Sequence, residues 1–338
     1  MRAATDWLAA PPPNAALDGG PKPARVGNVR VGTASWTEKT LLASRTFYPP
    51  AANTAERRLR YYAAHFPVVE VDATYYALPS SESARAWAER TPPDFAIGVK
   101  AYAALTQHPV QPARLDRDLQ EDLPRELRAR RNVYARDLPA GVVDEIWRRF
   151  HAALEPLRRA GKLAYVLFQM PKWFTPTRES HAFLEALDAR LPGSPLAVEF
   201  RQAGWMTEDR RARTLDFLRR NALVYVVVDE PQDTRASVPP VVAATADDLA
   251  VVRFHGRKKA TWDRPGVSTT ERFGYLYPPD ELREWVPRLR DLAGRTRQVH
   301  ALMNNCYRDY AVQNAKELAG FLMEEAGAAG SAVRPRRA

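Results

Sequence analysis

The sequence predicts a single closed (β/α)8 barrel of the TIM type, and three observations lead to that fold class. Eight short apolar runs alternate with helical patterns between residues 28 and 325, which is the order of a parallel α/β protein. The runs are mostly apolar throughout, as in strands covered on both faces. Polar residues collect where the runs end, and a barrel carries its ligand site at that end. A doubly wound open sheet is the alternative, but "GTASW" follows the first strand in place of a Gly-rich phosphate loop.

The strands and helices are placed by their hydrophobic patterns. Strands are expected at 29–33, 68–72, 95–100, 163–169, 196–201, 223–229, 251–255 and 299–304. Helices are expected at 54–65, 81–90, 144–159, 179–190, 208–220, 279–292 and 308–325. The connection 230–249 is rich in Pro, Thr, Asp and Ala, so we expect the sixth helix to be short or missing.

A long insertion, residues 102–141, follows the third strand. After Pro112 it carries seven Arg and six acidic residues, so it is nearly neutral. A connection of this length in a compact domain is usually functional. We expect a lid over the barrel, with a helix over 115–131 that is broken at Pro124.

The domain organisation follows from the composition of the two ends. We expect residues 1–27, rich in Ala and Pro, to be a disordered lead-in without the apolar core of a signal peptide. The barrel then covers 28–325, and 326–338 form a disordered basic tail. No apolar run approaches the roughly 18 residues that span a bilayer, so no membrane partner is expected. The lone Cys306 leaves no intramolecular disulfide partner and suits a cytoplasmic location.

The net charge is +10, from 50 basic and 40 acidic residues. A basic balance favours acidic partners such as phosphorylated small molecules or nucleic acid. Solvated surface charge on an Arg-rich chain is the alternative explanation, and composition alone does not separate the two.

Polar side chains stand at the C-terminal end of all eight predicted strands. The candidates for acid–base catalysis and its support are Glu70, Lys100, Glu199, Asp229 and His255. The candidates for ligand or phosphate binding are Thr74, His108, Gln169, Arg201, Arg253, Arg257, Asn304 and Asn305. Buried charges must be paired, and a polar cup shared by the strand ends would pair them. The alternative is a purely structural role, with Glu70–Arg201 or Glu199–Lys100 salt bridges inside the barrel.

The basic candidates indicate an anion site. We expect Arg253, Arg257 and Asn304 to hold the anion, because guanidinium and amide groups supply the donors that a phosphate accepts. Glu199 or Glu70 would act as general base or acid, with its pKa set by Arg201 and Lys100. Aromatic residues near the same end could stack on a base or sugar, or simply pack under loops: Trp36, Tyr75, Tyr76, Trp173, Trp205, Trp262, Tyr275, Tyr277 and Tyr307.

No cofactor is expected. His108 and His255, together with Glu70, Glu199 and Asp229, could form a carboxylate-rich divalent metal site, but no HxH or HxxxH spacing supports one. A nucleophilic Ser or Cys mechanism has no support either, because no GxSxG turn is present and Cys306 has no His nearby in the sequence.

Several stretches together resemble one family, the bacterial YecE-like proteins of domain of unknown function seventy-two. They are "VGTASW", "FYP", "RLRYYAAHFPVVEVDATYYALPS", "WAERTPPDFAIGVKA", "TQHP", "KLAYVLFQMP", "AVEFR" with Trp205, "VRFHGR" and "NNCYRDYAVQNAKEL". They run in order from residue 29 to residue 322. The resemblance implies a TIM-barrel-like fold with polar positions clustered at one end, and the acid–base and ligand-binding candidates above match its motif positions. It implies no reaction. The chain departs from the family pattern at Ala34–Ser35, where the family commonly has Ser-Gly, and in the long insertion.

The leading functional hypothesis is therefore a barrel that binds a phosphorylated or nucleic-acid ligand at its C-terminal end and hydrolyses it by carboxylate acid–base chemistry. Two alternatives remain open at this point. One is a non-catalytic nucleic-acid-binding protein, and the other is a metal-dependent isomerase or hydrolase of the xylose-isomerase-like type.

Overall fold

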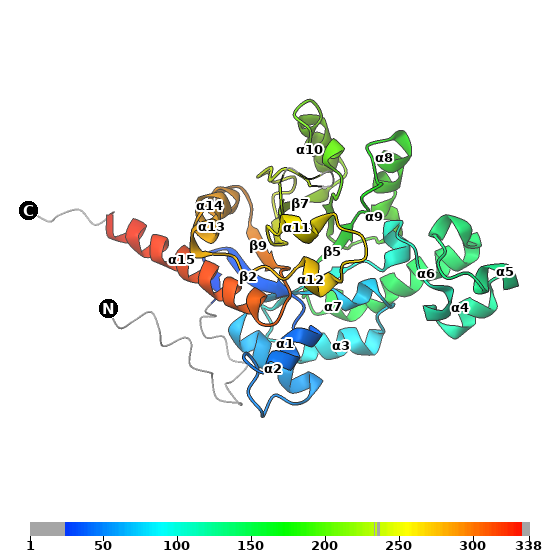
Figure 1. Cartoon of the computed structure of the whole chain (residues 1–338), viewed down its shortest axis with the longest axis horizontal. Coiled ribbons are helices and arrows are strands. Elements are labelled where there is room, and N and C mark those ends of the chain that lie inside the picture. Colours follow the sequence, from blue (N-terminus) through cyan, green and yellow to red (C-terminus); the bar gives the residue numbers. More distant parts are fainter. Residues whose placement is uncertain (1–23, 233, 235–236, 333–338) are drawn as a thin grey trace, which may run out of the picture.

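Eight parallel strands close into a barrel in the computed structural model, which describes residues 24–232, 234 and 237–332. The barrel strands are β2 (Val29–Ala34), β3 (Val68–Val71), β4 (Ala96–Lys100), β5 (Leu163–Gln169), β6 (Leu196–Glu199), β7 (Leu223–Asp229), β8 (Leu249–Phe254) and β9 (Gln298–Met303). The ring closes where β2 pairs with β9, from Val29 opposite Val299 to Thr33 opposite Met303 (Figure 1). The predicted closed barrel is confirmed, and the open sheet is excluded.

The strands lie at the short apolar runs of the sequence. Such runs suit these strands because both faces of each strand are covered by other parts of the protein. All residues of β2, β3, β4, β6, β7 and β8 are buried. One extra strand, β1 (Arg25–Val26), pairs antiparallel with the start of β2. The chain is therefore ordered before residue 28, where we expected the disordered lead-in to end. The rest of that lead-in, residues 1–23, lies outside the described residues.

The helices of the outer layer lie where the amphipathic patterns predict them, except the first, which is not predicted. They are α1 (Lys39–Ser44), α2 (Ala55–His65), α3 (Ser81–Glu89), α6 (Ala140–Ala153), α7 (Glu155–Arg159), α8 (Arg178–Glu185), α9 (Leu187–Arg190), α10 (Arg211–Arg220), α13 (Pro279–Arg283), α14 (Trp285–Arg295) and α15 (Tyr310–Ala332). Helices α2, α3 and α8 have a hydroxyl residue as N-cap. Thr54, Ser80 and Thr177 each accept a hydrogen bond from a backbone N–H in the first turn of the helix. Helix α15 continues to Ala332, seven residues beyond its predicted end. None of the described helices combines the length and apolar character needed to cross a membrane.

The connection between β7 and β8 contains no helix among its described residues, as the composition of this segment predicts. The connection after β8 holds only two short helices, α11 (Lys259–Trp262) and α12 (Thr269–Arg272), before α13 begins. This side of the barrel is therefore covered mainly by irregular chain.

The insertion after β4 folds into two short helices, α4 (Arg117–Glu121) and α5 (Arg125–Arg128). The predicted break at Pro124 lies at the start of the second helix. Arg149 of α6 donates hydrogen bonds to Asp116 and Asp118, and Figure 1 shows α4 and α5 at the outer side of α6. The role of the insertion as a lid stays a prediction.

Candidate functional site

A buried ionic network occupies the barrel interior near the C-terminal ends of the strands, which we call the mouth. Arg253 of β8 donates from Nη2 to Oε1 of Glu70 on β3 at 2.6 Å, and from Nη1 to Oε2 of Glu199 on β6 at 2.5 Å. All three side chains are completely buried. One guanidinium therefore joins three strands that are not neighbours in the ring. Because burying charge costs free energy, the fold alone does not account for this arrangement.

Glu199 is surrounded by donors. Its Oε1 accepts from Nε2 of Gln169 at 2.6 Å and from Nη1 of Arg201 at 3.3 Å, and Nε2 of His255 lies 3.1 Å away. Burial alone would raise the pKa of Glu199, but Arg253, His255 and Arg201 more than offset burial and hold that pKa well below its usual value. Glu199 is therefore a permanent anion that orients its neighbours.

Glu70 has the opposite electrostatic character. Burial raises the pKa of Glu70 to about 7, which Arg253 opposes and the nearby carboxylate of Asp72 reinforces. The Tyr165 hydroxyl donates to Oε2 of Glu70 at 2.9 Å. Two carboxylates on one guanidinium thus differ in their readiness to hold a proton, and such a separation is typical of acid–base sites.

His255 is held neutral and oriented. The Asn304 amide Nδ2 donates to Nδ1 of His255 at 2.8 Å, so the ring proton is on Nε2, which faces Glu199. Burial lowers the pKa of His255 to about 4, despite the nearby Glu199. The centres of the Trp262 and Phe273 rings lie 6.0 and 5.9 Å from the centre of the His255 ring.

Further charged groups surround this network, and Asp72 is the most exposed of them. Nζ of Lys100 lies 3.6 Å from Oδ1 of Asp72, and the Asp72 side chain is 26% exposed. The same Oδ1 lies 3.6 Å from Nη2 of Arg253 and has no hydrogen-bond partner. Nε of Arg201 lies 3.6 Å from the carboxylate of Glu230, and the Arg201 guanidinium stacks 4.6 Å from the centre of the Trp262 ring. The mouth therefore presents Lys100 and Arg201 as cations with loose partners.

A row of aromatic rings borders the mouth and is called here the aromatic row. Tyr75, His108, Trp173 and Tyr134 follow one another with ring centres 5.3, 5.8 and 6.3 Å apart. Trp173 is 53% exposed, and Nζ of Lys100 lies 4.8 Å from the Tyr75 ring centre. His108 and Tyr134 come from the two ends of the insertion. Burial, together with Lys100 and Arg201, lowers the pKa of His108 to about 4, so this ring is neutral at pH 7.

Most of the candidates selected from the sequence lie in or beside this site. The structure brings together Glu70, Lys100, His108, Gln169, Glu199, Arg201, Arg253, His255 and Asn304. Thr74 supports them from below, since its hydroxyl donates to the carbonyl oxygen of Lys100 at 2.6 Å.

Asp229, Arg257 and Asn305 are engaged elsewhere. Arg257 binds the carboxylate of Asp229 through Nε at 3.0 Å and Nη2 at 2.7 Å, and Nη2 also contacts Glu284 at 3.1 Å. The Asp229 oxygens accept further hydrogen bonds from Trp285 and Tyr277. Asn305 donates to the carbonyl oxygen of Tyr275 and to the side chain of Asn314. These three residues join the barrel to its outer layer rather than to the mouth.

Three residues of the site are not among the candidates selected from the sequence: Asp72, Tyr165 and Glu230. Trp262, which stacks on Arg201, is one of the aromatic residues expected near this end. Asp72 stands two positions after Glu70, and Glu230 directly follows Asp229, so a strand-end pattern could have included both. Tyr165 lies in the middle of an apolar strand, and its hydroxyl reaches Glu70 only across Gly98 of β4. Nothing in the local sequence signals that contact.

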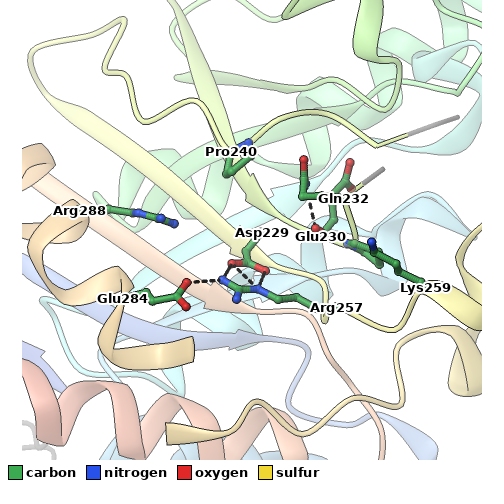
Figure 2. A pocket seen from close by; sticks show the side chains of 9 residues that line it. Asp229, Glu230, Gln232, Pro240, Arg257, Lys259, Glu284 and Arg288 are labelled. Atoms are coloured by element: carbon green, nitrogen blue, oxygen red, sulfur yellow. Dashed lines mark hydrogen bonds and ion pairs between the residues drawn. The ribbon is translucent and has the colours of Figure 1, made fainter. Parts of the chain in front are cut away.

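A cavity of about 300 Å³ lies beside the mouth (Figure 2). Its lining residues are Asp229, Glu230, Pro231, Gln232, Pro240, Arg257, Lys259, Glu284 and Arg288. We call it the flank cavity. Glu230 is shared, because it lines the cavity and also contacts Arg201.

Comparison with known proteins gives one consistent result. A family model described as "Protein of unknown function DUF72" matches residues 30–338. The UPF0759 protein YunF of Bacillus subtilis is 31% identical over 297 residues, which cover 87% of this chain and 94% of YunF. Among solved structures, a DUF72 family protein from Thermotoga maritima has a TM-score of 0.67 at 30% identity and covers 87% of this chain and 99% of its own. Another from Enterococcus faecalis has a TM-score of 0.69 at 24% identity, covering 87% and 95%.

Proposed function

Because the chain belongs to the DUF72 family of proteins of unknown function, we propose a function from its own site: the mouth binds a phosphorylated ligand that carries a ring, and hydrolyses it. The observation that supports this is the pair of buried carboxylates, Glu70 and Glu199, on the Arg253 guanidinium, with pKa values moved in opposite directions. A network so costly to bury is typical of a functional site.

The anion is assigned to Lys100 and Arg201. The sequence favours Arg253, Arg257 and Asn304 for this role, but Asn304 donates to His255 and both guanidinium groups are engaged by carboxylates. Arg253 binds Glu70 and Glu199, and Arg257 binds Asp229 and Glu284. Lys100 and Arg201 have looser carboxylate contacts, of 3.3 to 3.6 Å, and unlike Arg253 both keep some exposure to solvent. A phosphate between them would gain charge-assisted hydrogen bonds.

The proton chemistry is assigned to Asp72 and Glu70. Both carboxylates lie against Nη2 of Arg253, at 3.6 and 2.6 Å, and Asp72 alone of the two is exposed to a ligand. In hydrolysis a P–O bond breaks, water supplies the new oxygen and gives up a proton to a base, and the oxygen of the leaving group takes up a proton from solvent. Asp72 takes that role, while Glu70, with a pKa near 7, stores and returns a proton within the network.

The ring of the ligand is assigned to the aromatic row. Trp173 is exposed, and its neighbours Tyr134 and His108 bring aromatic edges beside it. Stacking of one base or sugar on such a ring contributes about 1–3 kcal/mol. A phosphate on Lys100 and a ring on Trp173 describe a nucleotide-like ligand.

Binding of nucleoside monophosphates and turnover of bis(p-nitrophenyl) phosphate test this proposal. Lys100→Gln should weaken nucleotide binding at least about tenfold at fixed salt, since a charged hydrogen bond is lost. Asp72→Asn should abolish turnover with little change in KM. Exposed Lys39→Gln and Asp188→Asn are the matched controls and should behave as the unchanged protein. The proposal fails if the unchanged protein binds none of these nucleotides, or if Lys100→Gln binds them equally well.

Non-catalytic binding of nucleic acid is the second candidate, favoured by the net charge of +10 together with the exposed rings of Trp173 and Tyr76. Salt dependence separates the two candidates. A protein that follows a phosphate backbone loses affinity with a log–log slope of about −0.7 per phosphate on a single strand, whereas one phosphate in the mouth gives a slope near −1 in total. Among the described residues, no group of three His, Cys, Asp or Glu is arranged to hold a metal.

A further inference from the structure

The flank cavity is lined in part by the connection between β7 and β8, which has no helix among its described residues. Glu230, Pro231, Gln232 and Pro240 of this connection form one wall, and Arg288 of α14 approaches from the other side (Figure 2). With about 300 Å³, the cavity is at the lower end of the range for small-molecule sites.

The floor of the cavity is rigid. The bidentate pair of Arg257 with Asp229 is fixed by hydrogen bonds from Trp285 and Tyr277 to the Asp229 oxygens, and Glu284 contacts the same guanidinium. The charge of Arg257 is therefore already balanced. It shapes the cavity without requiring an anion.

Arg288 is the cation of the cavity that lacks such a partner. Its guanidinium carbon lies 4.9 Å from the centre of the Trp285 ring, and no described carboxylate forms a salt bridge with it. Trp285 is itself bound to Asp229, so Arg288 rests on a fixed ring.

Glu230 supplies an acceptor on the opposite side. It is 1% exposed, its Oε1 accepts from the Val238 N–H at 2.6 Å, and its Oε2 has no hydrogen-bond donor among the described residues. A buried carboxylate oxygen without a donor is uncommon in native proteins. A hydroxyl group in the cavity would satisfy it.

From these two groups we propose that the flank cavity binds a small organic anion that also carries a hydroxyl. The anionic group contacts Arg288, and the hydroxyl donates to Oε2 of Glu230. Because Glu230 also contacts Arg201, the ligand lies one side chain away from the mouth, yet it uses neither Lys100 nor the aromatic row. The inference does not depend on the function proposed for the mouth.

Calorimetric titration at constant ionic strength tests the cavity with three probes: glycerol 3-phosphate, inorganic phosphate and glycerol. Glycerol 3-phosphate should bind more tightly than phosphate, and glycerol should not bind measurably. Arg288→Gln should weaken the binding of both anions at least about tenfold, because a charged hydrogen bond is lost. Glu230→Gln should remove the advantage of glycerol 3-phosphate over phosphate.

Arg290→Gln is the matched control. Arg290 lies on the same helix but does not line the cavity, and its Nη1 lies 3.0 Å from Oε2 of Glu325. Its affinities should equal those of the unchanged protein. The cavity is not a ligand site if the unchanged protein shows no saturable binding, or if Arg288→Gln binds glycerol 3-phosphate as tightly. Loss of binding in Lys100→Gln but not in Arg288→Gln would overturn this inference and leave the proposal for the mouth standing.

Discussion

Ser35 adopts a backbone conformation that favours glycine. Its φ angle is +105°, and it stands where the family motif commonly has Gly. A side chain in this region costs about 1–3 kcal/mol. The Ser35 hydroxyl accepts from the Thr37 N–H at 3.2 Å, which offsets a part of that cost.

Comparison of Ser35→Gly with Ser35→Ala isolates this strain, because both substitutions remove the hydroxyl and only Gly relieves the backbone. We expect the Gly variant to have a free energy of unfolding higher than that of the Ala variant by about 1 kcal/mol. Urea denaturation measures the difference. Equal stability of the two variants would show that the loop imposes no strain at Ser35.

Glu70 makes stability depend on pH in a defined direction. Its folded pKa of about 7 lies above the ordinary value of 4.5, so the folded state binds the proton more tightly than the unfolded state. The stability that Glu70 contributes is thus complete below pH 4.5 and is lost as pH rises through 7. His255 and His108, whose folded pKa values are lowered to about 4, act oppositely, and their contribution rises between pH 4 and 6.5.

The contribution of Glu70 is therefore obtained by subtracting the free energy of unfolding of Glu70→Gln from that of the unchanged protein. We expect the stability of the unchanged protein relative to Glu70→Gln to fall by about 3 kcal/mol between pH 4.5 and 7.5. Urea denaturation at several pH values measures it. Glu82→Gln, on the exposed first turn of α3, is the control and should give a flat difference across this range. A flat difference for Glu70→Gln as well would mean that Glu70 is ionised throughout.

At the scale of elements, Gly98 of β4 leaves room for Tyr165 of β5 to reach the site. A Cβ on Gly98 would lie 2.4 Å from Cζ of Tyr165, so only glycine leaves room for the ring that reaches Glu70. We expect Gly98→Ala to lower the free energy of unfolding by about 1–3 kcal/mol, as overpacked cores do. It should also weaken the hydrogen bond between Tyr165 and Glu70, and a change in tyrosine absorbance measures that loss.

Gly294→Ala on α14 is the matched substitution, since nothing lies within 4 Å of the added Cβ. Alanine in that open helical position should raise stability by up to about 1 kcal/mol. If both variants lose stability equally, the Gly98 effect does not come from Tyr165.

The strands and most helices could be predicted because their hydrophobic patterns are local. The pairing of the charges could not. Salt bridges of Glu70 with Arg201 and of Glu199 with Lys100 fit the sequence equally well, yet Arg253 binds both carboxylates. Which side chains meet inside a ring depends on their height along the barrel axis, and a list of strand ends does not contain that information.

The same limit explains Asp229. The sequence places it at the end of β7 with the other candidates, but its carboxylate turns to Trp285 and Arg257, whereas Glu230, one residue later, reaches Arg201. A shift of one position at a strand end decides between the mouth and the outer layer. The position at which the strand ends depends on its pairing with the neighbouring strands, which the local sequence does not specify.

At the scale of the whole molecule, Arg253 connects β3, β6 and β8 through one buried guanidinium. Arg253→Met leaves two buried carboxylates without their cation, and we expect a loss of about 3–5 kcal/mol in the free energy of unfolding. The triple variant Glu70→Gln, Glu199→Gln, Arg253→Met should recover most of that loss, because no uncompensated charge stays buried. Urea denaturation of both proteins measures the two effects.

The triple variant is also expected to lose any activity of the mouth, since it has no titratable pair. Arg148→Gln is the control, because Arg148 is exposed and its ion-pair partner among the described residues is Glu145; this substitution should cost no more than about 1 kcal/mol. A triple variant as unstable as Arg253→Met would show that the network holds the barrel together by shape rather than by charge balance.

The pairing of β2 with β9 has a consequence for synthesis of the chain. Val29 and its partner Val299 are 270 positions apart, so the ring stays open on the ribosome until almost the whole polypeptide has emerged. During that time the nascent sheet exposes two unpaired edges, which are templates for association with other chains. We expect a premature stop anywhere before β9 to leave an aggregating fragment rather than a smaller working protein.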